Sequence, residues 1–442
     1  MKIYFFIINL LLCLLGGMLS QSLFNLFAQF IFLVLGIFFC GKEVKNNKAI
    51  DIFLTLFAFY SLFTITTHFI FINNPYEDYF LSIDQQTFYK YSEELGQENW
   101  GEIFSEAFTQ FKYSELPLAV SLMGILHKIA LYFHCIDILY FLKLHIVLLT
   151  ALISVFIYKI TMTLGGLRKN TCQLIILFGL FSPLLLFSCQ LLRDMHICFL
   201  YVLMLYVVVK EQIKFRYISL LLLAFTIFLF RMENGLFAML FIALRVSIDY
   251  RKNNSYVKFI ILFCIIISII FSAIYIYTIM IDTLTSYSAR ALAEADYSSL
   301  GAKMAGFPFP LNYILCAVFS QILPFPLWIS YNKIDNYQWI MAVESITPLF
   351  WMSVWSIIIY AFIKKRKQIS FFLKYVLCIA LIYILLVAGG EINTRRLMAV
   401  YPLVFIVFLE VKDKVSIMNK KFVVLSICSL FLLLHIVYIF IK

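Results

Sequence analysis

Apolar runs as long as a lipid bilayer is thick follow one another along the chain, and they constrain its fold more than any other feature. A bilayer core of about 30 Å is crossed by a helix of roughly 20 apolar residues. Hydrophobic residues make up 63% of the 442 residues and charged residues 13%, which is more apolar surface than a soluble core could cover. Because backbone groups in lipid must bond within their own segment, the runs predict an all-α, polytopic transmembrane helical bundle.

Thirteen of these runs are predicted to cross the membrane. They lie at 2–19, 22–40, 50–72, 137–160, 171–190, 196–210, 217–230, 234–248, 258–281, 345–363, 371–388, 398–411 and 421–441. The first run is followed at once by a second and not by an A-x-A cleavage site, so we interpret it as an uncleaved span. Two further stretches, 117–133 and 311–330, are ambiguous by composition alone.

Basic residues give the predicted orientation. The formal charge is +11, but lysines and arginines fall in short blocks between apolar runs, which is a topology signal and not the pattern of a nucleic-acid binder. The six blocks are Lys42, Lys45 and Lys48; Lys159, Arg168 and Lys169; Lys210, Lys214 and Arg216; Arg251, Lys252 and Lys258; Lys364, Lys365, Arg366 and Lys367; and Lys412, Lys414, Lys420 and Lys421. All six are predicted to be cytoplasmic.

Because all six basic blocks are predicted to lie on one side of the membrane, the two ambiguous stretches can be assigned. If 117–133 or 311–330 crossed, the basic block after it would lie opposite the others. Both are therefore predicted not to cross, and 117–133, which contains His127 and Lys128, suits an interfacial helix. The prediction is a single transmembrane domain over 1–442 with about 13 spans, an N-terminus inside, an external loop with a juxtamembrane helix at 73–136, and a second external or interfacial region at 282–344.

Acidic residues gather in the first external loop. The region from Asn73 to Leu116 contains nine acids and two lysines. Three of the acids lie near the third span, namely Glu77, Asp78 and Asp84, and a carboxylate there can serve as a general base. The alternative is a solvated acidic loop that only satisfies the charge rule. We interpret the later acids in that way: Glu93, Glu94, Glu98, Glu102 and Glu106.

Isolated charges mark three short external turns. The arginines are Arg193, Arg231, Arg395 and Arg396, and the acids are Asp194, Glu233 and Glu391. Charges at the end of a span face a cavity or pair with each other. One interpretation is that they are interfacial anchors or Arg–acid pairs. The other is that arginines from three turns on one face form a clamp for phosphate, which planar guanidinium groups recognise in a bidentate way.

Several kinds of chemistry have no signal in the sequence. The ten cysteines are scattered singly, and the six histidines have no metal-ligand spacing, so no zinc site is indicated. P-loop, dinucleotide and GxSxG motifs are missing, which leaves ATP-driven transport and serine hydrolysis without support. No cofactor is predicted with certainty, and a divalent cation, Mg or Mn, is left open.

Three segments together resemble the C-type glycosyltransferase superfamily of multi-span membrane enzymes. They are DQQTFY at 84–89 followed by the proline-containing stretch 115–133, the run FGLFSPLLLFSCQLLRDMHICFL at 178–200, and NTRRLMAVYPLVFIVFL at 393–409. The order of these segments along roughly 50–410 carries the resemblance. The chain departs from the family pattern in having two earlier spans and no soluble C-terminal domain.

The resemblance implies transfer of a sugar from a polyprenyl-phosphate-linked donor to a glycan or lipid acceptor at the external, periplasmic face of a bacterial inner membrane. Asp84, with Asp78 or Glu77 as substitutes, would accept the acceptor's proton, and the four arginines would hold the phosphate. Polysaccharide or O-antigen repeat-unit polymerases have a similar layout and are the nearest rival. A third alternative is a flippase or secondary transporter, for which Lys143 and His145 are the best mid-membrane candidates.

Overall fold

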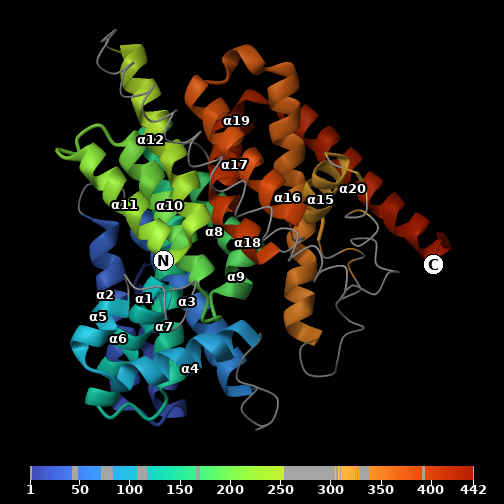
Figure 1. Cartoon of the computed structure of the whole chain (residues 1–442). Coiled ribbons are helices and arrows are strands. Elements are labelled where there is room, and N and C mark those ends of the chain that lie inside the picture. The colour runs from blue at the N-terminus through green and yellow to red at the C-terminus, as the bar shows by residue number, and fades with distance from the viewer. Residues whose placement is uncertain are drawn as a thin grey trace. The chain divides into compact units, whose positions relative to one another are not determined.

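The computed structural model is all-helical in the residues that it describes (Figure 1). These are residues 2–41, 48–70, 83–106, 117–165, 170–252, 304, 307–308, 310–323, 325, 327, 338–390 and 394–441. The predicted span 258–281 lies outside them. The described chain divides into two compact units, Met1–Gly235 and Leu236–Lys442, and each is described separately below. The prediction of a single transmembrane domain depends on how these units pack together and stays a prediction.

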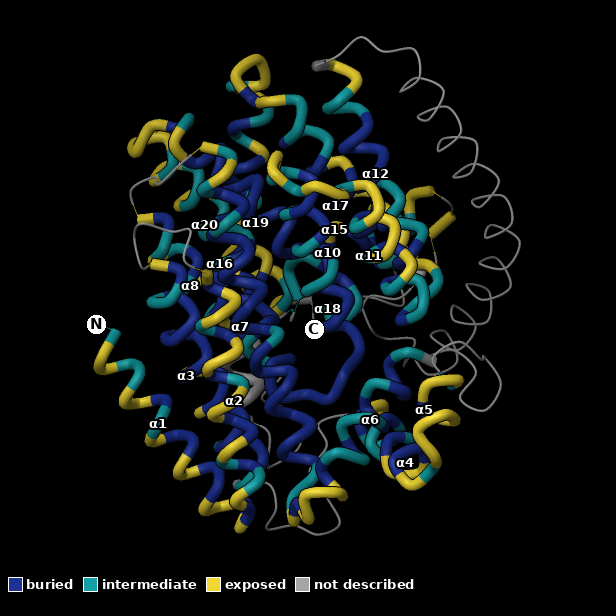
Figure 2. The backbone as a smooth tube through the Cα atoms, turned by 90° about the vertical axis from the view of Figure 1, so that its left-hand side faces the viewer, coloured by how far each residue is buried: buried dark blue, intermediate teal, exposed yellow. Residues whose placement is uncertain are grey.

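The first unit is built around one buried helix, α7 (Ile138–Gly165). Its sequence is apolar on nearly all sides, which is typical of a helix surrounded by others. It packs against α2 (Leu23–Cys40), α3 (Lys48–Ile70), α8 (Thr171–Phe181) and α10 (Arg193–Val209). Figure 2 shows α7 dark blue, whereas α1 (Lys2–Leu19) carries an exposed stripe. Such an apolar stripe is what a helix presents to lipid.

Close packing around α3 depends on small residues. A Cβ at Gly36 of α2 would overlap the ring of Phe53, and one at Gly179 of α8 would lie 2.8 Å from the hydroxyl of Tyr60. That hydroxyl donates a hydrogen bond to the Gly179 carbonyl at 3.0 Å. Backbones that approach this closely need glycine at the contact, as is common between membrane helices.

A layer of three helices lies across one end of α7, as Figures 1 and 2 show. It consists of α4 (Ile83–Gln97), α5 (Trp100–Glu106) and α6 (Pro117–Tyr132). Lys128 Nζ on α6 donates to the carbonyl of Glu98 at 2.6 Å, and so caps the C-terminal end of α4. Ser121 Oγ, also on α6, donates to the carbonyl of Ile103 at 2.7 Å. We call this end of the first unit, where α3 ends and α7 and α10 begin, the α4 end.

A buried histidine joins α4 to α6 and predicts an acid-sensitive contact. Burial lowers the pKa of His127 to about 4 from an ordinary 6.5. Its Nδ1 lies 3.3 Å from Ser92 Oγ, and because Ser92 donates its own proton to the Tyr89 carbonyl, the ring must be the donor in this bond. The fold therefore favours the neutral ring.

We expect the His127 contribution to stability to be complete above pH 6.5 and to be lost as the pH falls through about 4. The loss should amount to about 3 kcal/mol. Thermal unfolding of purified protein in detergent across this range should show the loss in the wild type and not in His127→Gln. The control His134→Asn changes an exposed histidine with φ of 51°, a conformation that Asn tolerates. An unchanged pH profile in His127→Gln would contradict the assignment.

The rest of the first unit continues through α9 (Pro183–Phe187), α10, α11 (Arg216–Phe230) and the start of α12 (Met232–Lys252). The predicted span 171–190 is broken in two, because Ser182 accepts a hydrogen bond from Leu184 N at 3.3 Å and Pro183 occupies the first turn of α9. Serine as an N-cap followed by proline starts a new helix. A bend thus precedes the turn at 188–192.

The second unit contains α15 (Leu311–Ser320), α16 (Gln338–Lys364), α17 (Phe371–Gly390), α18 (Thr394–Leu397), α19 (Tyr401–Val411) and α20 (Ile417–Ile441). Helix α19 is buried and packs against α16 and α17. Gln321 Oε1 accepts hydrogen bonds from the indoles of Trp351 and Trp355 at 2.9 and 3.1 Å. Most of α20 is exposed and apolar, and its His435 accepts a hydrogen bond from Leu327 N at 3.1 Å.

Seven described helices are long and apolar enough to cross a membrane, which identifies a membrane protein. They are Lys2–Leu19, Leu23–Cys40, Lys48–Phe69, Ile138–Gly165, Ser345–Lys364, Phe371–Ala388 and Ile417–Phe440. Five other predicted spans coincide with shorter or more polar helices, α8, α10, α11, α12 and α19. The ambiguous stretches form α6, with 16 residues, and α15, with 10. At 1.5 Å per residue, α15 is only about 15 Å long, half of a bilayer core.

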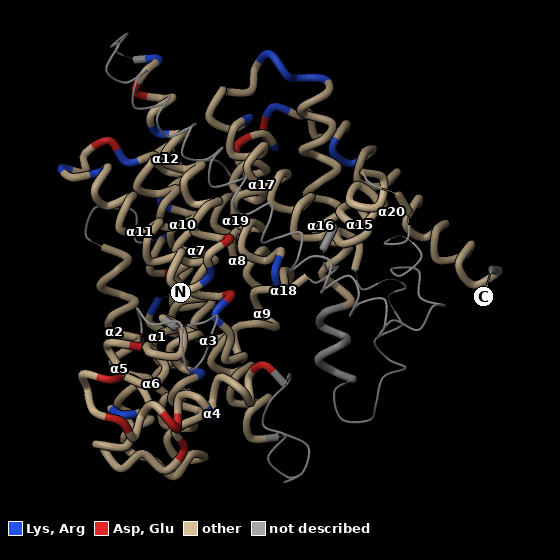
Figure 3. Tube along the Cα trace, in the orientation of Figure 1, with Lys and Arg blue, Asp and Glu red and all other residues tan. Residues whose placement is uncertain are grey.

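Basic residues of each unit meet at one end of its helices. In the first unit Lys159 Nζ donates to the Phe39 carbonyl at 2.6 Å, and both Lys159 and Lys210 lie over the ring of Tyr206. In the second unit Arg251 lies over Phe371, and Lys414 donates to the Gln368 carbonyl. Figure 3 shows acidic residues on the α4–α6 layer and basic residues near the link between α10 and α11. Blocks far apart in sequence are therefore grouped by the fold.

Candidate functional site at the start of α10

Two of the predicted arginines and one predicted acid meet where α10 begins and α11 ends. Arg193 and Asp194 are the first residues of α10, and their exposed fractions are 9% and 3%. Arg231 is the single extended residue between α11 and α12, with φ of −163° and ψ of 119°. Its Nη1 donates to Asp194 Oδ1 at 3.3 Å. Arg193 Nη1 donates to the Phe230 carbonyl at 3.4 Å. The two guanidinium groups thus belong to one corner of the first unit.

The break at Arg231 depends on a small residue one turn later. A Cβ at Gly235 would lie 2.5 Å from the Cα of Phe228, so any larger side chain would push α12 away from α11. Asn234 contributes to the same corner, because its carbonyl accepts a hydrogen bond from the buried hydroxyl of Tyr201 on α10 at 2.9 Å. Two hydrogen bonds, between Arg231 and Asp194 and between Tyr201 and Asn234, therefore connect α10 to the corner between α11 and α12. They hold Arg231 beside Asp194.

The first turn of α4 reaches the same region. Gln85 is completely buried, and its Oε1 accepts a hydrogen bond from Leu191 N at 2.8 Å. Leu191 lies two residues before Arg193. Asp84 directly precedes Gln85 in α4 and is exposed. The predicted base is therefore held on a helix whose start is bonded to the turn that leads into the arginine corner.

The remaining predicted site residues are placed elsewhere or are not described. Glu233 is exposed in the first turn of α12, and Arg395 and Arg396 are half-buried on α18 of the second unit. Glu77, Asp78 and Glu391 lie outside the described residues. Convergence of Arg395 or Arg396 with the corner of the first unit therefore stays a prediction.

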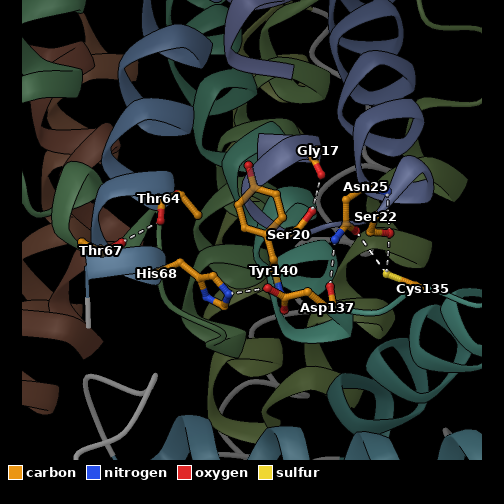
Figure 4. Close-up of polar contacts among 10 residues, drawn as sticks. All are labelled: Gly17, Ser20, Ser22, Asn25, Thr64, Thr67, His68, Cys135, Asp137 and Tyr140. Carbon is orange, nitrogen blue, oxygen red and sulfur yellow. Dashed lines mark hydrogen bonds and ion pairs between the residues drawn. The ribbon is translucent and has the colours of Figure 1, made fainter. Parts of the chain in front are cut away.

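A second polar cluster at the α4 end contains residues that the sequence did not suggest (Figure 4). His68 Nε2, on α3, lies 2.8 Å from Asp137 Oδ2, and Asp137 Oδ1 accepts a hydrogen bond from Tyr140 N at 3.0 Å. Asn25 Nδ2 donates to the Asp137 carbonyl at 3.0 Å. Asp137 is thus the N-cap of α7.

Ionisable side chains continue from this cluster into the bundle. Lys143 and His145 of α7 are buried, with exposed fractions of 2% and 7%. His145 Nε2 lies 3.2 Å from Nε2 of His196 on α10. Such a pair shares one N–H, because two imidazolium rings facing each other at this distance would repel. His196 also stacks on Phe230, whose carbonyl accepts from Arg193. The two polar regions of the first unit are therefore connected through α7 and α10.

The residues of these two polar regions that were not predicted differ in the strength of their sequence signals. Asp137 stands directly before an apolar run, which is the sequence signal of a helix N-cap. His68 near the end of a span is a weaker signal of the same kind. Gln85 and His196 have no local signal, because their roles arise from contacts 106 and 51 residues away.

The arginine corner has the chemistry of an anion site. It combines two guanidinium groups with one carboxylate and with the start of a 17-residue helix, whose N-terminus favours negative charge. Among the described residues, no group of three or more His, Cys, Asp or Glu side chains could hold a metal ion. The chain matches no protein-family model, no curated protein and no solved structure.

Proposed function

We propose that this chain is a membrane glycosyltransferase that transfers a sugar from a polyprenyl-phosphate-linked donor to a glycan or lipid acceptor at the external face. One observation carries the proposal: the hydrogen bond between Gln85 and Leu191 joins the helix that bears Asp84 to the turn that bears Arg193. A candidate base and a candidate phosphate clamp, 109 residues apart in sequence, thus lie on bonded elements of one unit.

In the proposed reaction, Asp84 accepts the proton of an acceptor hydroxyl as its oxygen attacks the anomeric carbon of the donor sugar. The new bond joins that oxygen to the anomeric carbon, and the bond from the anomeric carbon to the phosphate oxygen breaks. The electron pair stays on the released polyprenyl phosphate. Arg193 and Arg231 stabilise this negative charge, and Asp194 orients Arg231. Arg395 and Arg396 would add positive charge from the second unit. Whether a divalent cation takes part is left to experiment.

The topology proposed with this function has about 13 crossings, with the α4 end and Asp84 outside and the basic ends inside. It is supported by the acidic α4–α6 layer, by the basic blocks at the opposite end of the first unit, and by the positive-inside rule. In a bacterium the external face would be the periplasmic side of the inner membrane.

The decisive assay offers the purified protein a panel of polyprenyl-linked sugars with glycan and lipid acceptors. We expect loss of the lipid-linked donor and appearance of one transferred sugar. A ladder of products from a lipid-linked oligosaccharide would instead identify a repeat-unit polymerase. Addition of EDTA to the same reaction tests for a divalent cation. Intact donor in every reaction would contradict both enzyme assignments.

A transporter or flippase is the second candidate, and the buried residues Lys143, His145 and His196 favour it. Ionisable side chains inside a membrane bundle mark ion and substrate paths. In proteoliposomes a flippase would move intact lipid-linked sugar across the bilayer without cleaving it. This activity would depend on His145 and His196 and would survive Asp84→Asn, whereas the proposed transferase requires Asp84.

A further inference from the structure

We propose that Gln85 and the N-terminus of α10 form the seat of a phosphate group, with Arg193 and Arg231 supplying its positive charge. This inference rests on the proposed function, since it assigns the donor phosphate a specific place. Besides the two arginines, it assigns a binding role to Gln85 on α4, the helix that carries Asp84, and to the N-terminus of α10.

The side chain of Gln85 is the observation that points to a ligand. It is completely buried, and because a backbone N–H can only donate, the atom that bonds Leu191 N at 2.8 Å must be Oε1. Nε2 then carries two N–H donors at the same turn. Among the described residues this nitrogen has no hydrogen-bond partner. A buried amide donor without an acceptor destabilises the fold, so the site is suited to a ligand that supplies acceptor oxygens.

The helix next to this amide is oriented to hold an anion. Leu192, the N-cap residue of α10, has an extended backbone and no side-chain hydrogen bond to the helix. A leucine side chain has no oxygen with which to cap the first turn, so the helix N-terminus keeps its preference for an external acceptor. The amide of Gln85 therefore lies beside a helix start that its own sequence does not cap.

The arginines favour an anion over a neutral acceptor. Arg193 and Arg231 bring two guanidinium groups to the corner that also contains the carboxylate of Asp194. Both arginines are largely buried. The Arg193 residue is 9% exposed, and the side chain of Arg231 is 10% exposed. Arginine groups in such surroundings bind phosphate oxygens through paired N–H donors. A phosphate monoester satisfies the amide, the helix N-terminus and the guanidinium groups together.

The test measures binding and does not need turnover. Wild-type protein in nanodiscs of neutral phosphatidylcholine is titrated with a polyprenyl monophosphate and, in a separate arm, with inorganic phosphate. Gln85→Glu keeps an acceptor for Leu191 N but replaces the donor with a carboxylate. Gln85→Met removes the donor without adding charge and covers the case in which the first variant does not fold. Gln86→Glu is the matched control, because Gln86 is the adjacent, partly exposed residue of α4.

We expect both Gln85 variants to weaken binding by about 10- to 100-fold, which corresponds to one hydrogen bond to a charged group, while Gln86→Glu binds like the wild type. Binding of polyprenyl phosphate alone would identify a lipid headgroup seat, and equal binding of inorganic phosphate would identify a seat for free phosphate. Either result supports the inference if the Gln85 variants bind the probe more weakly than the wild type. Folded Gln85 variants that bind either probe as the wild type does, or wild type that binds neither, would overturn it. Gln85-dependent binding without sugar transfer would reject the proposed function and leave the phosphate seat standing.

Discussion

Asp84→Asn should lower sugar transfer by about 10² to 10⁴-fold, because it removes the proton acceptor and keeps the size of the side chain. The residue is exposed at the start of α4, so the substitution buries no new polar group. Folding should therefore be unaffected. The measurement is the initial rate of donor consumption by purified protein, with thermal unfolding recorded on the same samples.

The matched control for this prediction is Glu93→Gln. Glu93 is an exposed acid on the same helix, and the change removes one negative charge from α4 just as Asp84→Asn does. The rate should stay within about twofold of the wild type, since surface substitutions of this kind rarely affect other sites. Equal losses in the two variants would show that the charge of α4, and not a base at Asp84, supports the reaction.

The second large effect is expected at the buried pair of Arg231 and Asp194. Arg231→Met should destabilise the first unit by about 3–5 kcal/mol, because it leaves the carboxylate of Asp194 buried without its partner. The double variant Arg231→Met with Asp194→Leu should recover much of this stability, since it removes both charges. Thermal unfolding of the single and double variants in detergent gives the coupling between the two residues.

The same variants separate folding from chemistry. If Arg231 holds the donor phosphate, the double variant should regain stability and still transfer sugar at least about 10²-fold more slowly than the wild type. Recovery of activity together with stability would mean that the pair has only a structural role. A single variant as stable as the wild type would contradict the buried ion pair itself.

The helices of this chain were largely predictable from its apolar runs. The run 371–388 corresponds to α17 at Phe371–Gly390, because an uninterrupted apolar segment has one stable conformation in lipid. The run 171–190 was predicted as one span, and the break at Pro183 was not anticipated. Proline inside an apolar run is a local signal for such a break. Lengths were harder to predict, because α10 begins three residues earlier than its apolar run, at the charged pair Arg193 and Asp194.

The candidate site was predictable only in part. The alternation of spans places Arg193 and Arg231 at one end, because α10 and α11 are joined by a short link and run in opposite directions. Their pairing through Asp194, however, depends on helix rotation, which apolar periodicity does not define when a helix is apolar on nearly all sides. The contacts of Gln85 with Leu191 and of His68 with Asp137 depend on packing between distant segments. No local pattern encodes those distances.

The deep burial of α7 has a consequence for how the protein is made. This helix carries Lys143 and His145, and a charged side chain left facing lipid at mid-membrane costs about 2.5–3.5 kcal/mol on insertion scales. The partner of His145 is His196, which is synthesised 51 residues later. We therefore expect α7 to stay beside the translocon or earlier helices during biogenesis until α10 has been synthesised. Helix α20 is apolar and mostly exposed, so lipid can cover most of its surface as soon as it enters the bilayer.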